Sequence, residues 1–453
     1  MTEEKNQSDS QLWSHNRLSS PDVPYFGLPK DVRFCSQCSY SNQKPNSARE
    51  FSHSPDSKKE TVDFDSAGVC AACRYAEKKK LVNWVEREKE LTELCSRYRK
   101  SNGEYDCIVP GSGGKDSFYT SYVLKYKYGM NPLTITWAPH IYTSWGWDNF
   151  QSWIHSGFDN QLYTPNGRVH RVLTRLALEK LFHPFQPFMM GQMQLPPKIA
   201  FDLGIPLVFY GENPIEYGNR VIGDDSPNKT SAAFTSDFEE EIYIAGTSYS
   251  ELVSEFGMSK LDLAPYLPLS REKFERSNIN VQYLGYYLPW HPQELFYFAV
   301  ENGGFKPAPE RTSGTYSKYS SIDDKIDDFH YYCTYVKFGI GRATYDSSQE
   351  IRNGEISRSE AVSLIEKFDG EYPKRFEKEC FDYFSLDGKE FRDVAKQFNA
   401  SHFDQERFEF LADSFRSPHL WCKCKGSWHL RNPIYWNANY SCETRTTNPI
   451  FKE

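Results

Sequence analysis

The alternation of apolar and polar residues predicts strands and helices that alternate along the middle of the chain. Short apolar runs at 105–110, 131–138 and 205–210 have the length and composition of buried strands. Between them, apolar residues at helical spacing predict helices over 116–128 and 173–181. Strands that alternate with helices favour a parallel sheet covered on both faces. The predicted fold class is therefore α/β.

Helical patterns also occur outside this core. Over residues 75–100, apolar side chains recur at helical spacing among Glu, Lys and Arg: Leu81, Trp84, Val85, Leu91 and Leu94. Ser357 and Glu360 have the spacing of a capping box just before an apolar run. We expect a mobile tail (1–30), a cysteine-containing module (31–80), the sheet domain (81–330) with an insertion at about 225–280, and a mostly helical region (331–453).

Composition narrows the class of protein. The chain has 453 residues and a formal net charge of −8, which disfavours a protein whose main task is to bind nucleic acid. Aromatic residues make up 16% of the chain, which indicates a large aromatic core or a site that stacks on a flat or sugar ligand. The first thirty residues lack an apolar segment, and no run of apolar residues is long enough for a membrane span. We expect a cytoplasmic protein with no membrane insertion and with reduced thiols.

A glycine-rich turn between a predicted strand and a predicted helix is the main functional motif. Residues 105–117 read YDCIVPGSGGKDS. Glycines allow a tight turn, and its N–H groups together with the helix N-terminus can bind a phosphate. Ser112, Ser117 and Lys115 add hydroxyl donors and a positive charge. The Walker P-loop is excluded because the glycine spacing differs and Asp116 stands where Ser or Thr is required.

Two C-x-x-C pairs predict a structural zinc site. They comprise Cys35, Cys38, Cys70 and Cys73, and four thiolates close a tetrahedral site with no position open for catalysis. A thioredoxin-like redox role is the weaker interpretation, because neither pair follows a suitable strand.

The other cysteines have no such pattern. A second metal site would require Cys422, Cys424 and Cys442, with His429 nearby, and a set of three thiols leaves this question open. Isolated cysteines are expected to be buried thiols: Cys95, Cys107, Cys333 and Cys380. No cysteine stands in the context of a glutaminase nucleophile.

The segment GSGGKDS resembles the PP-loop, S-G-G-x-D-S, of the ATP pyrophosphatase superfamily, which includes asparagine, GMP and NAD synthetases and several tRNA thiolases. The resemblance implies a PP-loop core domain that holds the pyrophosphate of ATP. The residues implied in ATP binding are Gly111, Ser112, Gly113, Gly114, Lys115, Asp116 and Ser117, with Trp137 and Ala138 near the adenine. Asp116 would position Mg²⁺, and Lys115 and Asp116 are catalytic candidates.

An ordered set of segments resembles a narrower family. They are GVCAACRYAEKK, GSGGKDS, LVFYGENPIEYG, the region around KFGIGR, and DSFRSPHLW, which together span about 34–421. The set is similar to the N-acetyl sugar amidotransferases of bacterial lipopolysaccharide O-antigen and pseudaminic-acid-type biosynthesis. The resemblance implies conversion of an acetamido group to acetamidino on a bacterial surface-polysaccharide sugar, which would be nucleotide-activated or a nonulosonate. The amide oxygen would be adenylated by ATP, and ammonia would then displace AMP. Because this chain lacks a glutaminase cysteine, a separate glutaminase subunit or free ammonium would supply the ammonia.

Further candidates flank these motifs. Glu212 and Asn213 follow a predicted strand and, with Tyr217, are candidates for binding the sugar or its amide; a satisfied turn is the alternative. Glu212 is also a catalytic candidate. Lys337 and Arg342 flank two glycines and suit a phosphate, either of the ATP tail or of the substrate's anionic group, and both are also catalytic candidates.

Acidic and histidine side chains give weaker signals. Four aspartates read more simply as a charged helix face than as a metal site: Asp323, Asp324, Asp327 and Asp328. His140 reads more simply as a surface histidine than as a base.

Two other functions fit parts of the sequence. A tRNA thiolase also combines a PP-loop with C-x-x-C modules, but the acidic balance and the lack of a basic arm count against it. A zinc-stapled scaffold with a vestigial nucleotide site is the non-enzymatic alternative. The intact Lys115-Asp116-Ser117 sequence argues against decay.

Overall fold

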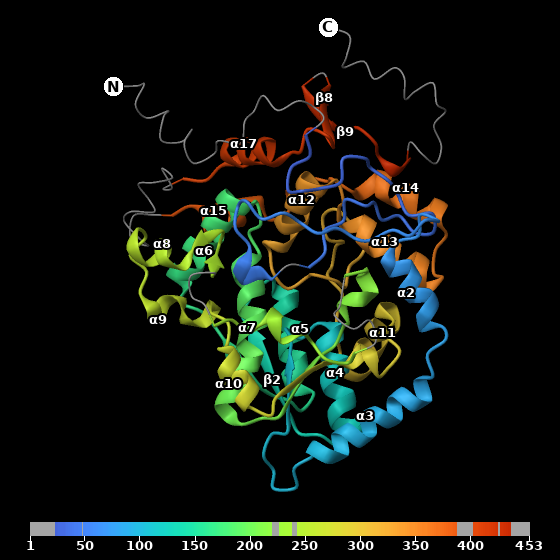
Figure 1. Cartoon of the computed structure of the whole chain (residues 1–453), viewed down its shortest axis with the longest axis vertical. Helices are drawn as coiled ribbons and strands as arrows, with labels where there is room; N and C mark the ends of the chain where they lie inside the picture. Colours follow the sequence, from blue (N-terminus) through green and yellow to red (C-terminus); the bar gives the residue numbers. More distant parts are fainter. Residues whose placement is uncertain are drawn as a thin grey trace.

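The computed structural model (Figure 1) describes residues 23–47, 49–219, 226–237, 242–386, 402–424 and 426–435. The main sheet has five strands in the order β3-β2-β1-β4-β7, and every neighbouring pair is parallel. The strands are β1 (Cys107–Pro110), β2 (Pro132–Trp137), β3 (Asp159–Tyr163), β4 (Leu207–Tyr210) and β7 (Asn280–Tyr283). The predicted α/β class and parallel sheet are therefore confirmed.

The direction in which strands are added reverses next to β1. From β1 the chain adds β2 and then β3 on one side, whereas β4 and β7 lie on the other side. Cys107 is paired with both Pro132 of β2 and Leu207 of β4. In open α/β sheets a crevice forms at the carboxyl ends of the strands where the order reverses, which here are β1 and β4.

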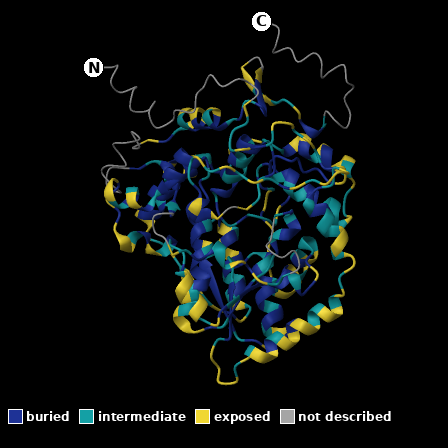
Figure 2. Ribbon diagram, in the orientation of Figure 1, coloured by how far each residue is buried: buried dark blue, intermediate teal, exposed yellow. Residues whose placement is uncertain are grey.

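Helices cover both faces of the sheet. Alternate residues of the strands point to opposite faces, so Ile108 packs with α6 (Gly167–Leu181) and α7 (Gln186–Leu203). Cys107 and Val109 pack with α3 (Trp84–Tyr98), α11 (Pro292–Gly303) and the π-helical segment η2 (Val123–Lys127). Strands β1, β2, β4 and β7 are almost entirely buried, and dark blue ribbon marks the buried centre of the molecule in Figure 2. This burial on both faces explains why they read as continuous apolar runs.

A helical layer lies over the carboxyl edge of the sheet (Figure 1). It contains α12 (Asp327–Phe338), α13 (Arg342–Asn353), α14 (Arg358–Phe368), α15 (Glu377–Phe384) and α17 (Gln405–Phe415), followed by the hairpin β8 (Trp421–Cys424) and β9 (Ser427–Leu430). Ser357 and Glu360 form the predicted capping box at the start of α14. The helical C-terminal region is thus confirmed over its described residues.

The N-terminal module packs against this helical layer. Ser39 and Ser348 hydroxyl oxygens are 2.7 Å apart, and Arg358 Nε donates to the Cys38 carbonyl at 3.2 Å. The module contains η1 (Glu50–Ser52) and α2 (Ala71–Lys79). Residues 1–22 of the predicted tail lie outside the described part of the chain. Its last residues are docked, since Leu28 is buried and Phe26 lies between Phe338 and Phe415.

Two other predictions about elements need correction. The helix predicted over 75–100 is two helices, because Asn83 caps a new helix and accepts from Glu86 N. Leu81 and Val85 are 87% and 80% exposed, so the apolar stripe assigned to them is wrong. Residues 242–280 of the predicted insertion form small elements whose apolar side chains join the main core: β5 (Tyr243–Ile244), β6 (Thr247–Ser248), α8 (Tyr249–Ser254), α9 (Lys260–Leu263) and α10 (Arg271–Arg276).

The sequence patterns also missed α5 (Ser144–His155), β3, α7, β7 and α11. Strand β3 is partly exposed at the sheet edge, with few apolar residues. Helix α7 contains Pro196 and Pro197, and the low helix propensity of proline kept the sequence pattern from predicting a helix here. Tertiary packing overrides these local signals. Among the described helices, none is both long and apolar enough to cross a membrane.

Candidate functional site

The glycine-rich turn lies between β1 and α4 (Lys115–Tyr122), at the reversal of strand order. Gly113 has φ +87°, and a Cβ there would lie 2.6 Å from Phe150 Cα. A Cβ at Gly111 would lie 2.0 Å from Ser117 Cβ. The backbone is therefore pressed against α4 and α5, where side chains cannot fit. Gly114 caps α4 and has open space around it, so its free side faces the site.

A cavity of about 700 Å³ lies at this turn. Residues 112–116 form one part of its wall, and residues that follow β4, α12, α13 and the N-terminal module form the rest. Sequence-predicted residues that line the cavity are Ser112, Gly113, Gly114, Lys115, Asp116, Glu212, Tyr217, Lys337 and Arg342. Segments far apart in the sequence thus meet in one cavity large enough for a nucleotide and a second ligand.

Five predicted residues are not in the cavity wall. Gly111 and Ser117 lie beneath the turn, where Ser117 Oγ donates to the Gly114 carbonyl at 3.0 Å. Trp137 is buried and stacks on Tyr163, and Ala138 N donates to the Tyr163 carbonyl at 2.9 Å. Their contact with adenine stays a prediction.

Asn213 is the fifth. Its side chain accepts from Ile215 N at 3.2 Å and caps the turn η3 (Pro214–Tyr217). Asn213 therefore matches the alternative given in the sequence analysis, in which its side chain is hydrogen-bonded within a turn and not to a ligand.

Charged groups gather beside the turn. Lys115 Nζ is 2.6 Å from Asp116 Oδ2, while Asp116 Oδ1 is buried with no hydrogen-bond partner in the described part of the chain. Tyr217 Oη donates to Glu212 Oε1. Burial and the negative charge of Asp116 raise the pKa of Glu212 to about 7. The turn therefore presents a carboxylate oxygen free to bind a cation, next to a second carboxyl poised to exchange a proton near neutral pH.

The aspartates at 323–328 are not a solvated helix face. Asp323 lines the cavity, where burial raises the pKa of its carboxyl while a hydrogen bond with Ser112 opposes the rise. Burial likewise raises the pKa of Asp327 well above its usual range. Asp324 accepts from His140 N at 2.6 Å, and its Oδ2 is 2.7 Å from His140 Nδ1. The prediction of a surface histidine at 140 was therefore also wrong, because that side chain is 0% exposed.

Arg342 and Lys337 line the same cavity but do not form the expected pair. Arg342 begins α13, where its Nε is 3.0 Å from Asp346 Oδ1 and its Nη1 donates to Tyr331 Oη. Lys337 lies in the last turn of α12, and its Nζ donates to the Leu181 carbonyl at 2.7 Å. Burial lowers the pKa of Lys337 to about 7. The two cations thus face different groups and can contact different parts of a ligand.

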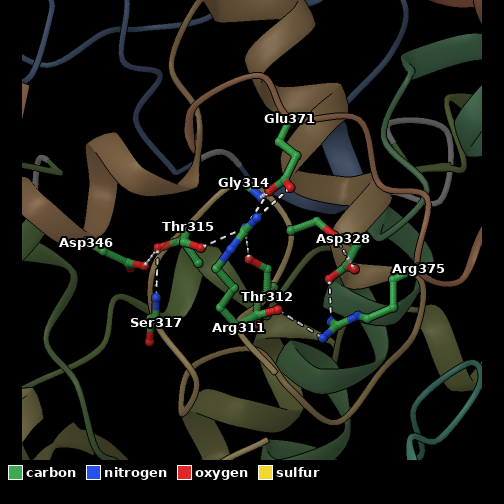
Figure 3. A network of polar contacts seen from close by, with 10 residues as sticks. Arg311, Thr312, Gly314, Thr315, Ser317, Asp328, Asp346, Glu371 and Arg375 are labelled. Atoms are coloured by element: carbon green, nitrogen blue, oxygen red, sulfur yellow. Dashed lines mark hydrogen bonds and ion pairs between the residues drawn. The ribbon is translucent and has the colours of Figure 1, made fainter. Parts of the chain in front are cut away.

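A polar network fixes Asp346, the partner of Arg342 (Figure 3). Thr315 Oγ1 donates to Asp346 Oδ2 at 2.6 Å. The loop that carries Thr315 is in turn held by Arg311, which makes a bidentate pair with Glu371 at 2.5 and 2.6 Å. Arg375 bridges the Arg311 carbonyl and Asp328. The guanidinium of Arg342 is therefore held from several sides before any ligand binds.

The four predicted zinc ligands form one buried cluster. Their sulfur atoms all lie within 4.8 Å of one another, with Cys38–Cys70 at 3.6 Å and Cys35–Cys73 at 3.9 Å. A Zn–S distance of about 2.3 Å gives tetrahedral S···S edges of about 3.8 Å, so this donor set fits zinc. The charge of the buried Arg352 acts on the Cys38, Cys70 and Cys73 thiols and would offset the negative charge of a zinc tetrathiolate.

Other cysteines follow the prediction where they are described. Cys95, Cys107, Cys333 and Cys380 are free and buried. Cys422 is also buried, but Cys442 lies outside the described residues, so the question of a second site stays open.

Comparison with known proteins bears on the helical layer. Residues 313–409 match a family model described as the C-terminal domain of WbpG-like LPS biosynthesis proteins. The match supports a role in lipopolysaccharide biosynthesis. We call residues 313–409 the WbpG-like region. An uncharacterized protein of Methanocaldococcus jannaschii, MJ1599, is 32% identical over 77 residues. That alignment covers 17% of this chain and 27% of the relative.

The WbpG-like region supplies much of the cavity wall, and part of it was missed in the sequence. Asp327, Tyr331, Thr334, Asp346 and Gln349 line the cavity from α12 and α13. Asp327, Tyr331 and Thr334 recur at helical spacing on α12, a signal that could have indicated a polar face turned toward a ligand. The polar residues of the N-terminal module that reach the cavity, Glu50 and His53 among them, have no such periodicity.

Proposed function

We propose that this chain is an ATP-dependent amidotransferase that converts an acetamido group of a bacterial surface-polysaccharide sugar to acetamidino. The observation that carries the proposal is the GSGGKDS turn at the reversal of strand order, with Gly113 and Gly111 pressed where no side chain fits. A PP-loop core of the ATP pyrophosphatase type accounts for this turn and its sequence. The match of the WbpG-like region supports the link to lipopolysaccharide.

In this proposal the turn binds the phosphates of ATP. The N–H groups at the start of α4 and the ammonium of Lys115 donate hydrogen bonds to the pyrophosphate oxygens. The residues present fit Mg²⁺, because Asp116 Oδ1 is buried without a hydrogen-bond partner among the described residues. Bound there, Mg²⁺ would neutralise the departing pyrophosphate. Arg342, fixed by Asp346, would stabilise charge that develops on the reacting groups.

Two displacements complete the reaction. The acetamido oxygen attacks the α-phosphorus of ATP, so that an O–P bond forms and the bond to the β-phosphate oxygen breaks, releasing pyrophosphate. Neutral ammonia then attacks the imidate carbon; a C–N bond forms, the C–O bond breaks and AMP leaves. An attacking ammonia must lose a proton, and Glu212, whose pKa is about 7, can accept it.

The remaining parts of the chain have supporting roles in this proposal. The tetrathiolate zinc is structural, since its four ligands leave no position for a substrate. A separate glutaminase subunit would deliver ammonia to the cavity, which would keep it neutral and out of water. We propose that the enzyme acts in the cytoplasm and binds no nucleic acid.

The test is mass spectrometry of N-acetyl sugars after incubation with the chain, ATP and ammonium. We expect a product lighter than the substrate, because oxygen is replaced by NH, and we expect ¹⁵N from labelled ammonium in it. Thiolation of tRNA in a parallel incubation with a sulfur donor would instead favour the thiolase. ATP binding without any product from either acceptor would favour a non-catalytic scaffold.

A further inference from the structure

A second group of titratable side chains lines the cavity, away from the glycine-rich turn. It comprises Glu50, His53, Lys59, His183, His330 and Lys337, and we call it the cationic cluster. It is assembled from the N-terminal module, the segment between α6 and α7, and α12. The reaction proposed above uses none of these groups except as the cavity wall.

The cluster is tightly built around one carboxylate. Glu50 Oε2 is 3.7 Å from His53 Nδ1 and 3.8 Å from His183 Nε2, which is too far for a hydrogen bond. Lys59 Nζ is 3.3 Å from His53 Nδ1. The rings of His183 and His330 stack with their centroids 4.9 Å apart. His330 Nδ1 is buried and has no hydrogen-bond partner within the described ranges.

Side chains that can carry a positive charge outnumber those that can carry a negative charge in this cluster. Two lysines and three histidines face a single carboxylate, and Lys337 Nζ uses one of its three donors on the Leu181 carbonyl. Burial lowers the pKa of Lys337 to about 7 and that of His330 to about 4, and it also lowers the pKa values of Lys59, His53 and His183. Such groups lack the counter-charge that would keep them protonated.

We propose that the cationic cluster binds an anionic group, a carboxylate or a phosphate ester, of a second ligand that shares the cavity with ATP. Lys337, Lys59 and His330 would donate hydrogen bonds to the oxygen atoms of this anionic group. Aromatic side chains that line the adjoining wall, Phe182, Phe185, Phe188 and Phe338, would contact an apolar or sugar face of the same ligand.

Lys337 lies too far along α12 from the turn to serve the phosphates of the same ATP. Asp327 is close to Asp323, which is hydrogen-bonded with Ser112 of the turn. Lys337 lies ten residues farther along α12, or about 15 Å along the helix axis. A triphosphate held at the turn does not span that distance. If the proposed function is right, the ligand is the acceptor sugar, and the cluster would hold the anionic group of that sugar; that step rests on the proposed function.

The test is isothermal titration calorimetry with the full chain. Its ligands are N-acetylneuraminic acid (a carboxylate), UDP-N-acetylglucosamine (a diphosphate ester) and uncharged N-acetylglucosamine. Saturating α,β-methylene ATP occupies the turn throughout. We expect at least one charged sugar to bind, and Lys337→Met to weaken it about 10- to 100-fold. Binding should also take up protons, seen as a heat that depends on the buffer, because the anion restores the pKa of Lys337.

Lys229→Met is the matched control. Lys229 is also buried among aromatic rings, its pKa is lowered to about 8 by burial, and it does not line the cavity. Its substitution should leave sugar affinity unchanged. If Lys337→Met does not fold, as circular dichroism would show, the half-buried Lys59→Met variant decides.

Two results would overturn the inference. One is equal affinity for charged and uncharged sugars; the other is a loss of affinity in the folded cluster variants no larger than that in Lys229→Met. The carboxylate and phosphate arms identify the anion. Because no turnover is measured, charged-sugar binding without any amidination would sink the proposed function and leave this inference standing.

Discussion

The carboxylate of Asp116 has one oxygen paired with Lys115 and the other without a hydrogen-bond partner among the described residues. We expect Asp116→Asn to keep the fold and to lower pyrophosphate release about 10²- to 10³-fold, because a preorganised charge at the phosphates is lost. Asp148→Asn, on the exposed face of α5, is the control. Full activity of Asp116→Asn, measured as pyrophosphate per minute, would refute the assignment of the turn.

Glu212 predicts a pH dependence of stability. Its pKa is about 7 in the native state, whereas an exposed glutamate titrates near 4.3. The native state therefore keeps a proton that the unfolded state has lost. Stability from this group is full below the unfolded pKa and is lost as pH rises through about 7.

The Glu212→Gln side chain cannot ionise. The free energy of unfolding of this variant, compared with that of the wild type, should therefore rise by about 1–2 kcal/mol between pH 5 and pH 8. This value is smaller than the full pKa shift would give, because the Glu212 side chain is only half-buried. Urea unfolding at several pH values measures the difference. A difference that stays constant with pH would contradict the raised pKa.

At the scale of elements, substitutions at two glycines of the turn between β1 and α4 should distinguish effects on folding from effects on ATP binding. Gly113→Ala requires a strained φ and a contact of 2.6 Å with Phe150 Cα, so we expect it to lower both stability and ATP affinity. Gly114→Ala has an ordinary φ and meets no atom within 4 Å. It should retain the melting temperature but lose ATP affinity, since the new methyl group points into the site.

Thermal unfolding and ATP titration of both variants check this contrast. If Gly114→Ala binds ATP as the wild type does, the open side of Gly114 is not the phosphate site. If Gly113→Ala is as stable as the wild type, the close approach to Phe150 is not a constraint on the turn.

The same elements show what the sequence can predict. Strands β1, β2 and β4 were predictable because burial on both faces leaves short, continuous apolar runs, and the turn was predictable because glycine spacing reports backbone geometry directly. Helix α7 was missed because packing overrides Pro196 and Pro197. The cationic cluster was missed because its members come from segments whose proximity depends on the fold, with Glu50 and Lys337 far apart in the chain.

At the scale of the whole molecule, the four-cysteine cluster of the N-terminal module lies next to the helices that form the wall of the cavity. Arg358 of α14 donates to the carbonyls of Cys35 and Cys38, and Ser39 contacts Ser347 and Ser348 of α13. Helix α13 also carries Arg342 and Asp346, which line the cavity. Zinc bound by the four cysteines would therefore stabilise a surface against which the cavity wall is packed.

Cys70→Ser should remove about one zinc per chain by elemental analysis and lower the melting temperature, because structural zinc contributes directly to folding free energy. Cys95→Ser is the matched control: Cys95 is equally buried but isolated, and burial raises the pKa of its thiol to about 12. This control should keep its zinc. An unchanged metal content in Cys70→Ser would contradict the tetrathiolate site.

The central claim is that ATP is split between its α- and β-phosphates when an acetamido sugar and ammonia are present. The most direct measurement is chromatography of the nucleotide products from ATP, with and without an N-acetyl sugar and ammonium. The proposed function predicts AMP and pyrophosphate in equal amounts, dependent on the sugar and abolished in Asp116→Asn. ADP and inorganic phosphate as products, or AMP formed equally well without any sugar, would contradict it.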